Sequence, residues 1–236
     1  MGVAGEVAPL RAVQRARRKL ADVGPAYTRS EGDFERVSLP NDDCDALRDV
    51  LVAEGARVVI EIGLAYASSS LAIAEALLSQ GHREPEHIII DAFQHEFGDV
   101  GWDMLCAAGL RSVCALVRDR SQMALPRLAS EGVIADAAFV DGSHIFHNVF
   151  VDLYFLRDLV RPGGLVVLDD CEWASVATAV AYFEANAGWQ PHRLGGRTRL
   201  RAFRLPEPRV EPKFEDFQAF GPAAVARRGR REGRAP

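Results

Sequence analysis

The sequence predicts a doubly wound α/β fold with a mostly parallel sheet. Between about residue 58 and residue 169, short apolar runs alternate with amphipathic helical stretches. Short, wholly apolar runs are typical of strands that are buried on both faces, and the helices between them serve as crossover connections. Proteins of this class bind their ligands outside the carboxyl ends of the strands, so the functional residues are expected at those ends.

Two helices are expected before the sheet. Residues 7–20 alternate apolar and basic positions, as an amphipathic surface helix does. Glycine and proline residues between positions 24 and 40 indicate a loop. Asn41 or Asp42 is placed to cap a second helix that runs to about Glu54.

The sheet itself is expected to contain five parallel strands, to which a hairpin adds two more. The parallel strands are predicted at 58–60, 88–90, 113–117, 137–140 and 165–168. The helices between them are predicted at 68–79, at 99–108, at 122–130 and from about 146 to the Arg161-Pro-Gly-Gly turn. Two further strands, around 189–194 and 199–205, flank Gly195-Gly196, a pair that suits a hairpin turn. The result is a seven-stranded sheet with an antiparallel C-terminal hairpin.

Composition excludes several classes of protein. The 236 residues suffice for one large domain, and 48% hydrophobic with 26% charged residues is ordinary for a globular protein. No apolar run approaches the roughly 20 residues that cross a bilayer, and no secretion signal is expected at the N-terminus. The net charge of −5 does not favour nucleic acid as a partner, and the basic clusters at 15–19 and 227–234 are interpreted as a solvated helix face and a tail.

The four cysteines show no CxxC spacing, which argues against a zinc site or a redox motif. We interpret them as free thiols in a reducing cytoplasm.

Acidic residues stand at four of the predicted strand ends: Glu61, Asp91, Asp141 and Asp169. One such carboxylate would mean little, because loops are polar anyway. Four of them at one edge of a sheet favour a cationic ligand.

The first strand–helix turn is built from small residues, Gly63-Leu-Ala65-Tyr-Ala67-Ser68. Such a turn lets the backbone approach a ligand closely and exposes amides at a helix N-terminus. It lacks the full GxGxxG of a dinucleotide site. Asp91, after the second strand, is placed to bind ribose hydroxyls, although a helix cap or turn residue is the alternative interpretation.

Taken together, five motifs resemble those of the metal-dependent small-molecule O-methyltransferases. This group includes catechol O-methyltransferase and the bacterial enzymes that methylate macrolide and aminocoumarin sugars. The likeness covers roughly residues 40–205 and implies the class I, Rossmann-like fold of enzymes that use S-adenosylmethionine (SAM). The motifs are Glu61-Ile-Gly63, Ile-Ile-Asp91, Ser121-Gln122, Phe139-Val-Asp141-Gly-Ser-His144 and Arg161-Pro-Gly-Gly-Leu-Val-Val-Leu-Asp169-Asp170.

This resemblance implies a role for each matched position. The residues expected to bind SAM are Glu61, Gly63, Ala65, Ser69, Asp91, Ser121, Gln122 and Asp141. Asp141, Asp169 and Asp170 correspond to ligands of Mg²⁺ or another divalent cation. Three carboxylates on neighbouring strand ends, about 5 Å apart, would repel one another unless a cation bridged them or they were protonated. In the alternative, one aspartate caps a helix and the others face solvent.

His144 follows the predicted metal ligand Asp141 by three residues and is the expected general base, with His147 as the weaker candidate. Some sugar-modifying relatives carry an acidic residue two positions after that aspartate, where this chain has Ser143. The reaction expected is in-line transfer of a methyl group to a hydroxyl of a small molecule, and the resemblance suggests a natural-product intermediate as the acceptor.

Other functions stay open on the sequence alone. They are a metal-independent N- or C-methyltransferase, a nicotinamide-dependent oxidoreductase, and a non-catalytic ligand-binding relative. Residues 1–40 are expected to form a lid or dimer contact and residues 41–205 the methyltransferase domain. Residues 206–236, rich in proline and arginine, are expected to be largely disordered beyond a short docked segment at Phe214 to Phe220. A homo-oligomer is possible, and no membrane partner is expected.

Overall fold

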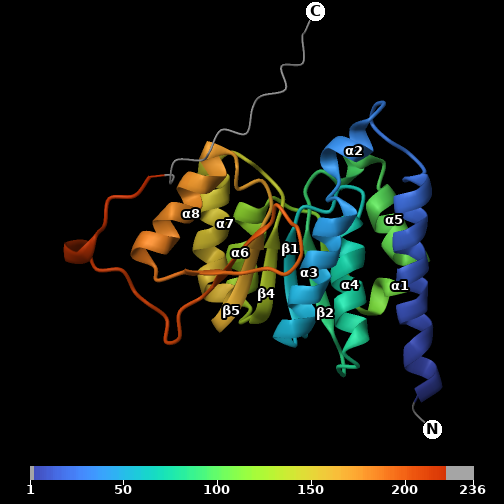
Figure 1. The fold of residues 1–236 in the computed structure, drawn as a ribbon, viewed down its shortest axis with the longest axis horizontal. Helices are drawn as coiled ribbons and strands as arrows, with labels where there is room; N and C mark the ends of the chain where they lie inside the picture. Colours follow the sequence, from blue (N-terminus) through green and yellow to red (C-terminus); the bar gives the residue numbers. More distant parts are fainter. Residues whose placement is uncertain (1–2, 222–236) are drawn as a thin grey trace, which may run out of the picture.

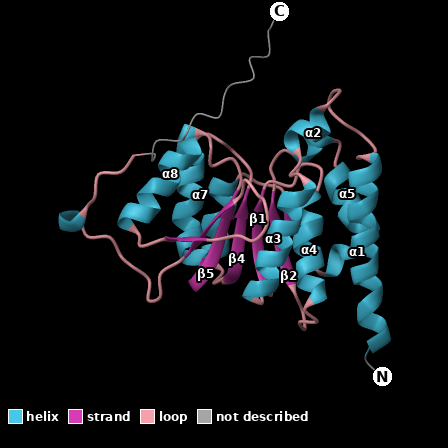
Figure 2. Cartoon of the chain, in the orientation of Figure 1, coloured by secondary structure: helices cyan, strands magenta, loops and turns pink. Residues whose placement is uncertain are grey.

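A central sheet lies between two layers of helices (Figures 1 and 2). The computed structural model describes residues 3–221. The strand order is β3-β2-β1-β4-β5-β7-β6. Strands β1 to β5 pair in parallel, β7 is antiparallel to β5, and β6 is antiparallel to β7. The doubly wound sheet with an antiparallel C-terminal hairpin is thereby confirmed.

The strands are short, as expected for a sheet that is buried on both faces. They are β1 Val58–Ile62, β2 Glu86–Ile90, β3 Cys114–Val117, β4 Ala135–Val140, β5 Val160–Leu168, β6 Gln190–His192 and β7 Arg201–Arg204. The α-helices are α1 Val3–Val23, α2 Asp33–Val37, α3 Asn41–Glu54, α4 Ser68–Ser79, α5 Val100–Ala107, α6 Ser121–Ser130, α7 Phe146–Leu159 and α8 Ala174–Asn186. Single 3-10 turns occur at Gln94–Phe97, Leu110–Ser112 and Phe214–Asp216.

Several sequence expectations need correction. Neither α2 nor α8 was predicted. Helix α3 begins at Asn41 itself, after Pro40, without a side-chain cap. The stretch Arg161–Gly164 opens β5 rather than only ending α7, and the ladder between β4 and β5 is irregular at this point. The hairpin is not a tight turn at Gly195-Gly196, because residues 193–200 form a longer connection between β6 and β7.

Two hydrophobic clusters fill the spaces between the sheet and the helices. Alternate residues of β1 point to opposite faces: Val59 contributes to the cluster under α1, α3 and α4, whereas Ile60 contributes to the cluster under α6, α7 and α8. The fully buried Leu71 of α4 and Phe183 of α8 anchor the two helical layers. Apolar burial on both faces leaves the strand ends as the places where polar chemistry is possible.

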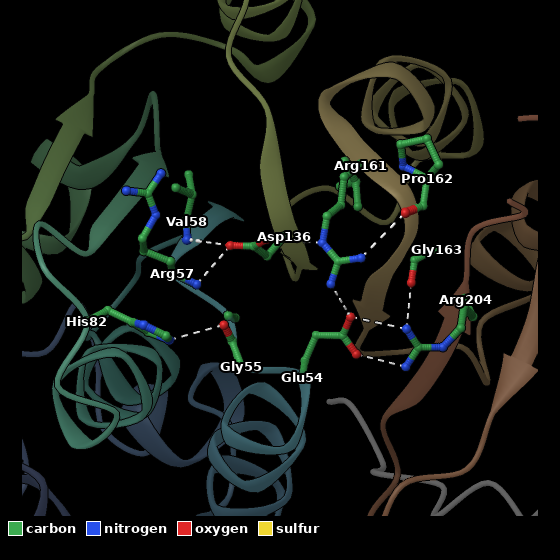
Figure 3. A network of polar contacts seen from close by, with 12 residues as sticks. Glu54, Gly55, Arg57, Val58, His82, Asp136, Arg161, Pro162, Gly163 and Arg204 are labelled. Atoms are coloured by element: carbon green, nitrogen blue, oxygen red, sulfur yellow. Dashed lines mark hydrogen bonds and ion pairs between the residues drawn. The ribbon is translucent and has the colours of Figure 1, made fainter. Parts of the chain in front are cut away.

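A polar network closes the amino-terminal edge of the parallel strands (Figure 3). Glu54, at the end of α3, accepts hydrogen bonds from Arg161 (2.6 Å) and Arg204 (3.1 and 2.8 Å). Asp136 accepts hydrogen bonds from the amides of Arg57 and Val58, at the start of β1. These contacts hold α3, β1, β4, β5 and β7 together at the edge that lies away from the ligand-binding ends of the strands.

The segment after β7 packs only lightly on α8. The ring of Phe220 lies 5.3 Å from that of Tyr182, while Phe214 is largely exposed. The last 15 residues of the predicted tail, 222–236, which include the basic stretch at 227–234, lie outside the described residues. Among residues 3–221, no helix combines the length and apolar character needed to cross a membrane.

Candidate active site

The turn after β1 passes so close to the end of β4 that its first residue must be glycine. Gly63 has a φ of +99°, and a Cβ atom placed on it would lie 2.1 Å from the carbonyl oxygen of Asp141. A side chain is therefore excluded by space as well as by backbone conformation. The small-residue turn and the predicted metal aspartate are thus in direct backbone contact.

Two alanines in this turn adopt the left-handed conformation that glycine favours: Ala65 has a φ of 43° and Ala67 a φ of 70°. The carboxylate of Asp91 supports the turn. Asp91 Oδ2 accepts hydrogen bonds from the amides of Leu64 (3.0 Å) and Ala65 (3.2 Å), and Oδ1 accepts one from Phe93 (2.7 Å). Asp91 therefore acts as a turn residue in this structure, and its contact with a ribose stays a prediction.

Glu61 is the next-to-last residue of β1 and is completely buried. The hydroxyl groups of Ser69 and Ser70, at the start of α4, donate hydrogen bonds to its two carboxylate oxygens. His87 Nε2 lies 2.9 Å from Glu61 Oε2 without hydrogen-bond alignment. Burial disfavours an imidazolium here, but Cys114 and Glu61 outweigh it and raise the pKa of His87 to about 9. Glu61 therefore joins α4 to the sheet, and the structure does not place it among the residues that line the cleft.

Residues 24–40 are attached to the same turn through Tyr66. The buried phenol of Tyr66 donates a hydrogen bond to Asp33 of α2 and accepts one from the amide of Arg29 (3.2 Å). The Arg29 guanidinium pairs with Asp33 (2.8 and 3.1 Å) and lies 4.1 Å from the centre of the Phe97 ring. These contacts hold α2 beside the turn, where a lid would have to lie.

The pH dependence of stability should report on this attachment. Hydrogen bonds from Arg29 and Tyr66 lower the pKa of Asp33 from 3.8 to about 2. A carboxyl whose pKa is lowered on folding stabilises the protein above its unfolded pKa, and the contribution disappears as the pH falls through the folded pKa. We expect Asp33→Asn to lower the free energy of unfolding by about 1–2 kcal/mol near neutral pH. Urea titrations should show this difference shrinking between about pH 4 and pH 2, and a difference that does not vary with pH would contradict the assignment.

A cleft with a volume of about 210 Å³ opens between the turn, α2 and the ends of β4 and β5. Seven residues predicted from the sequence line it: Gly63, Ala65, Ser69, Asp141, His144, Asp169 and Asp170. Arg36 and Arg199, which were not predicted, also line it. Glu61, Asp91, Ser121 and Gln122 do not belong to its wall.

Within this cleft, side-chain donor atoms of Asp141, His144 and Asp170 all lie within 4.8 Å of one another. His144 Nε2 lies 2.7 Å from Asp170 Oδ2 and 3.9 Å from Asp141 Oδ1. Burial and the carboxylates of Asp169 and Asp170 raise the pKa of Asp141 well above its ordinary value. The hydrogen bond between His144 and Asp170 raises the pKa of the histidine and lowers that of the aspartate. The three side chains form a site in which positive charge is stabilised.

Asp169, the third predicted metal ligand, forms hydrogen bonds with Arg199 instead. Arg199 donates hydrogen bonds through Nε to Asp169 Oδ1 (2.8 Å) and through Nη2 to Oδ2. The structure therefore brings together Asp141, His144 and Asp170 rather than the three aspartates. The sequence offers no signal for Arg199, which is one of several arginines in and beside the connection between β6 and β7.

Ser121 and Gln122 begin α6, and Ser121 lies next to a buried carboxylate that sequence reasoning missed. Asp152 of α7 has no exposed surface, and neither carboxylate oxygen has an aligned hydrogen-bond partner among the described residues. Burial raises the pKa of Asp152 to about 7, and the neighbouring hydroxyl of Ser121 limits the rise. Asp152 stands in the middle of an apolar helix face, and no motif in the sequence distinguishes it as a functional residue.

Comparison with known proteins identifies the class of protein that this fold and cleft define. Residues 60–171 match a family described as a methyltransferase domain. The matched segment runs from β1 to the residues after β5 and so contains the turn, Asp91, Asp141, His144 and the Asp169-Asp170 pair. No curated protein matches the sequence.

Solved structures share the fold at low sequence identity. The O-methyltransferase TomG from Streptomyces achromogenes, solved with SAM, is 18% identical, with a TM-score of 0.62 over 83% of this chain and 89% of that one. An O-methyltransferase from Bacillus cereus, solved with S-adenosylhomocysteine (SAH), is 16% identical, with a TM-score of 0.59 over 83% and 90%. CalS11, a TDP-rhamnose 3′-O-methyltransferase, is 17% identical, with a TM-score of 0.54 over 82% and 93%.

The chain therefore has the class I methyltransferase fold, and slightly less than half of it, residues 60–171, matches a methyltransferase domain. The enzyme class predicted from the motifs is confirmed.

Proposed function

We propose that this enzyme transfers the methyl group of SAM to a hydroxyl group of a small molecule. The observation that carries the proposal is the pairing of His144 with Asp170, 2.7 Å apart, in the cleft that the SAM-type turn also lines. A hydroxyl loses its proton when its oxygen is methylated, and a positioned histidine is the commonest group to take it. The O-methyltransferases among the structures of similar fold agree with this choice of acceptor atom.

Residues of this chain can account for each bond and for the proton in the proposed methyl transfer. A bond forms between the acceptor oxygen and the methyl carbon while the bond from that carbon to sulfur breaks, so the sulfonium of SAM becomes the thioether of SAH. Asp170 engages His144 Nε2, which leaves Nδ1 free to accept the hydroxyl proton. The carboxylate also stabilises the imidazolium that results. Gly63, Ala65 and Ser69 are proposed to hold the donor against the turn, with Asp91, Ser121 and Gln122 binding its nucleoside.

A divalent cation requires a ligand set different from the one predicted. Arg199 occupies both oxygens of Asp169, so Asp141 and Asp170 are the carboxylates that would hold Mg²⁺ or a similar ion. His144 is the third donor within reach, but it cannot be ligand and base at once, and its pairing with Asp170 favours the base. When bound, such an ion would orient the acceptor oxygen and lower the pKa of its hydroxyl. A metal-independent reaction is the second candidate, favoured by the positive charge that Arg199 already supplies.

The acceptor is proposed to be a natural-product intermediate, since TomG is involved in tomaymycin synthesis and CalS11 in calicheamicin biosynthesis. The cytoplasm is the proposed compartment. Its reducing conditions suit the four free cysteines, three of which are buried.

Ligand binding provides the direct test of this proposal. SAH should raise the melting temperature, because a ligand at about 100 times its Kd stabilises the folded state by about 2.7 kcal/mol. Asp91→Ala should remove most of that increase, through the turn that Asp91 supports or through a lost ribose contact. Asp103→Ala, an exposed substitution on α5, serves as the control and should leave the shift unchanged.

NAD, added in place of SAH, tests the oxidoreductase alternative. Calorimetry that detects no heat of binding with SAM or SAH at millimolar concentration would refute the proposed function.

A further inference from the structure

The connection between β6 and β7 places Arg199 in the wall of the acidic cleft, where hydrogen bonds hold both its backbone and its side chain. Figure 1 shows this connection, in orange, reaching across the sheet toward α3. Asp43, buried in the first turn of α3, accepts hydrogen bonds from the Thr198 hydroxyl (2.5 Å) and from the amide of Arg199 (3.0 Å). Asp43 therefore holds the backbone of Arg199 in place, independently of the contacts that its side chain makes with Asp169.

The side chain of Arg199 then pairs with the most buried carboxylate of the cleft. Only 1% of the Asp169 side chain is exposed, and both of its oxygens accept hydrogen bonds from the guanidinium. This two-point contact is the strong geometry for arginine and a carboxylate. A buried carboxylate without a counter-charge is costly, so Asp169 needs either this guanidinium or another cation.

A guanidinium and a divalent cation compete for the same oxygens. The side-chain donor atoms of the cleft that lie within 4.8 Å of one another belong to Asp141, His144 and Asp170. Asp169 is adjacent to Asp170 in sequence, and its charge already acts on Asp141 by raising the pKa of that group. Asp169 lines the same cleft, but its oxygens lie outside the group of donor atoms that are within 4.8 Å of one another, and both of them accept hydrogen bonds from Arg199.

We propose that Arg199 withholds Asp169 from any divalent cation in this cleft and thereby sets the cation affinity of the enzyme. Removing the guanidinium should free Asp169 to join Asp141 and Asp170 and create a three-carboxylate site. The inference rests on the proposed cation position in the cleft and is independent of the acceptor.

The experiment measures Mn²⁺ binding to the full chain by calorimetry and by the loss of the free-ion electron paramagnetic resonance signal. Arg199→Met should bind Mn²⁺ about 10–100-fold more tightly than the wild type, because one more carboxylate ligand becomes available. Arg199→Lys keeps the positive charge but cannot make the two-point contact of a guanidinium, so its gain in Mn²⁺ affinity should be smaller. Arg197→Met removes an exposed arginine from the same connection and should change the affinity by less than about threefold, as expected for a screened surface charge.

A double-mutant cycle assigns the gain to Asp169. Adding Asp169→Asn to Arg199→Met should abolish the increase, whereas Asp169→Asn alone should leave the wild-type affinity nearly unchanged. The proposal is overturned if Arg199→Met binds Mn²⁺ no more tightly than the wild type, or if the gain survives Asp169→Asn.

Melting temperatures and SAH binding, recorded on the same samples, show that each variant is folded. If Arg199→Met is not, the lysine variant decides the question, since equal Mn²⁺ affinity for lysine and arginine would contradict the proposal. Loss of SAH binding by the wild type would refute the proposed function without affecting this comparison.

Discussion

Replacing His144 by alanine is expected to lower kcat by about 10²–10⁴, which is the usual contribution of a positioned general base. The affinity for SAH should stay nearly intact, because His144 lies at the Asp170 side of the cleft rather than in the turn. Activity should partly return at high pH, where the acceptor hydroxyl ionises without help. Initial rates across a pH series, combined with SAH calorimetry, measure both quantities.

The pH profile of the wild type adds an internal check. Asp170 raises the pKa of His144, so the neutral base form is lost at a higher pH than for a free histidine, and activity should fall on the acid side. His147→Ala, on the next turn of the same exposed segment, is the matched control and should keep its activity. A kcat for His144→Ala within about twofold of the wild type, against the expected 10²–10⁴, would exclude His144 as the base.

Gly63→Ala is expected to be the most disruptive single substitution in the turn. The added Cβ would lie 2.1 Å from the carbonyl oxygen of Asp141, at a φ of +99° that alanine rarely adopts. Either the turn or the end of β4 must move, at an expected cost of about 2–4 kcal/mol in unfolding free energy. SAH-induced stabilisation should disappear as well, because the turn would no longer have its native path.

Chemical denaturation with and without SAH measures the two effects separately. Gly81→Ala is a useful control, since Gly81 also has a positive φ (+64°) but nothing lies within 4 Å of its added Cβ. That variant should show only the backbone penalty, about 1 kcal/mol, and normal SAH binding. If Gly63→Ala is no less stable than Gly81→Ala, the close approach to Asp141 is not what requires glycine.

Much of this architecture could be predicted because it depends on local patterns. Helix α4 has the predicted bounds, Ser68–Ser79, and the apolar runs that precede Asp91, Asp141 and Asp169 are strands. Apolar periodicity and strand-end chemistry are properties of consecutive residues. They are visible without knowing which segments meet in space.

What escaped prediction depends on contacts between distant segments. Glu61 was expected in the cleft, but Ser69, Ser70 and His87 surround its carboxylate inside the protein. Arg199 could not be distinguished from its neighbouring arginines, because its role follows from Asp43, more than 150 positions away. Helix α8 went unpredicted because its weakly amphipathic, alanine-rich stretch follows the acidic pair without any turn signal.

The two left-handed alanines of the turn have a consequence for how such enzymes are found. A search pattern that demands glycine after Gly63 at positions 65 and 67 would reject this sequence, although Ala65 and Ala67 keep φ angles of 43° and 70°. What the turn needs at these positions is a positive φ angle, and an L-residue can supply it at a cost of about 1–2 kcal/mol. Signatures written as backbone angles would therefore retrieve members that signatures written as letters overlook.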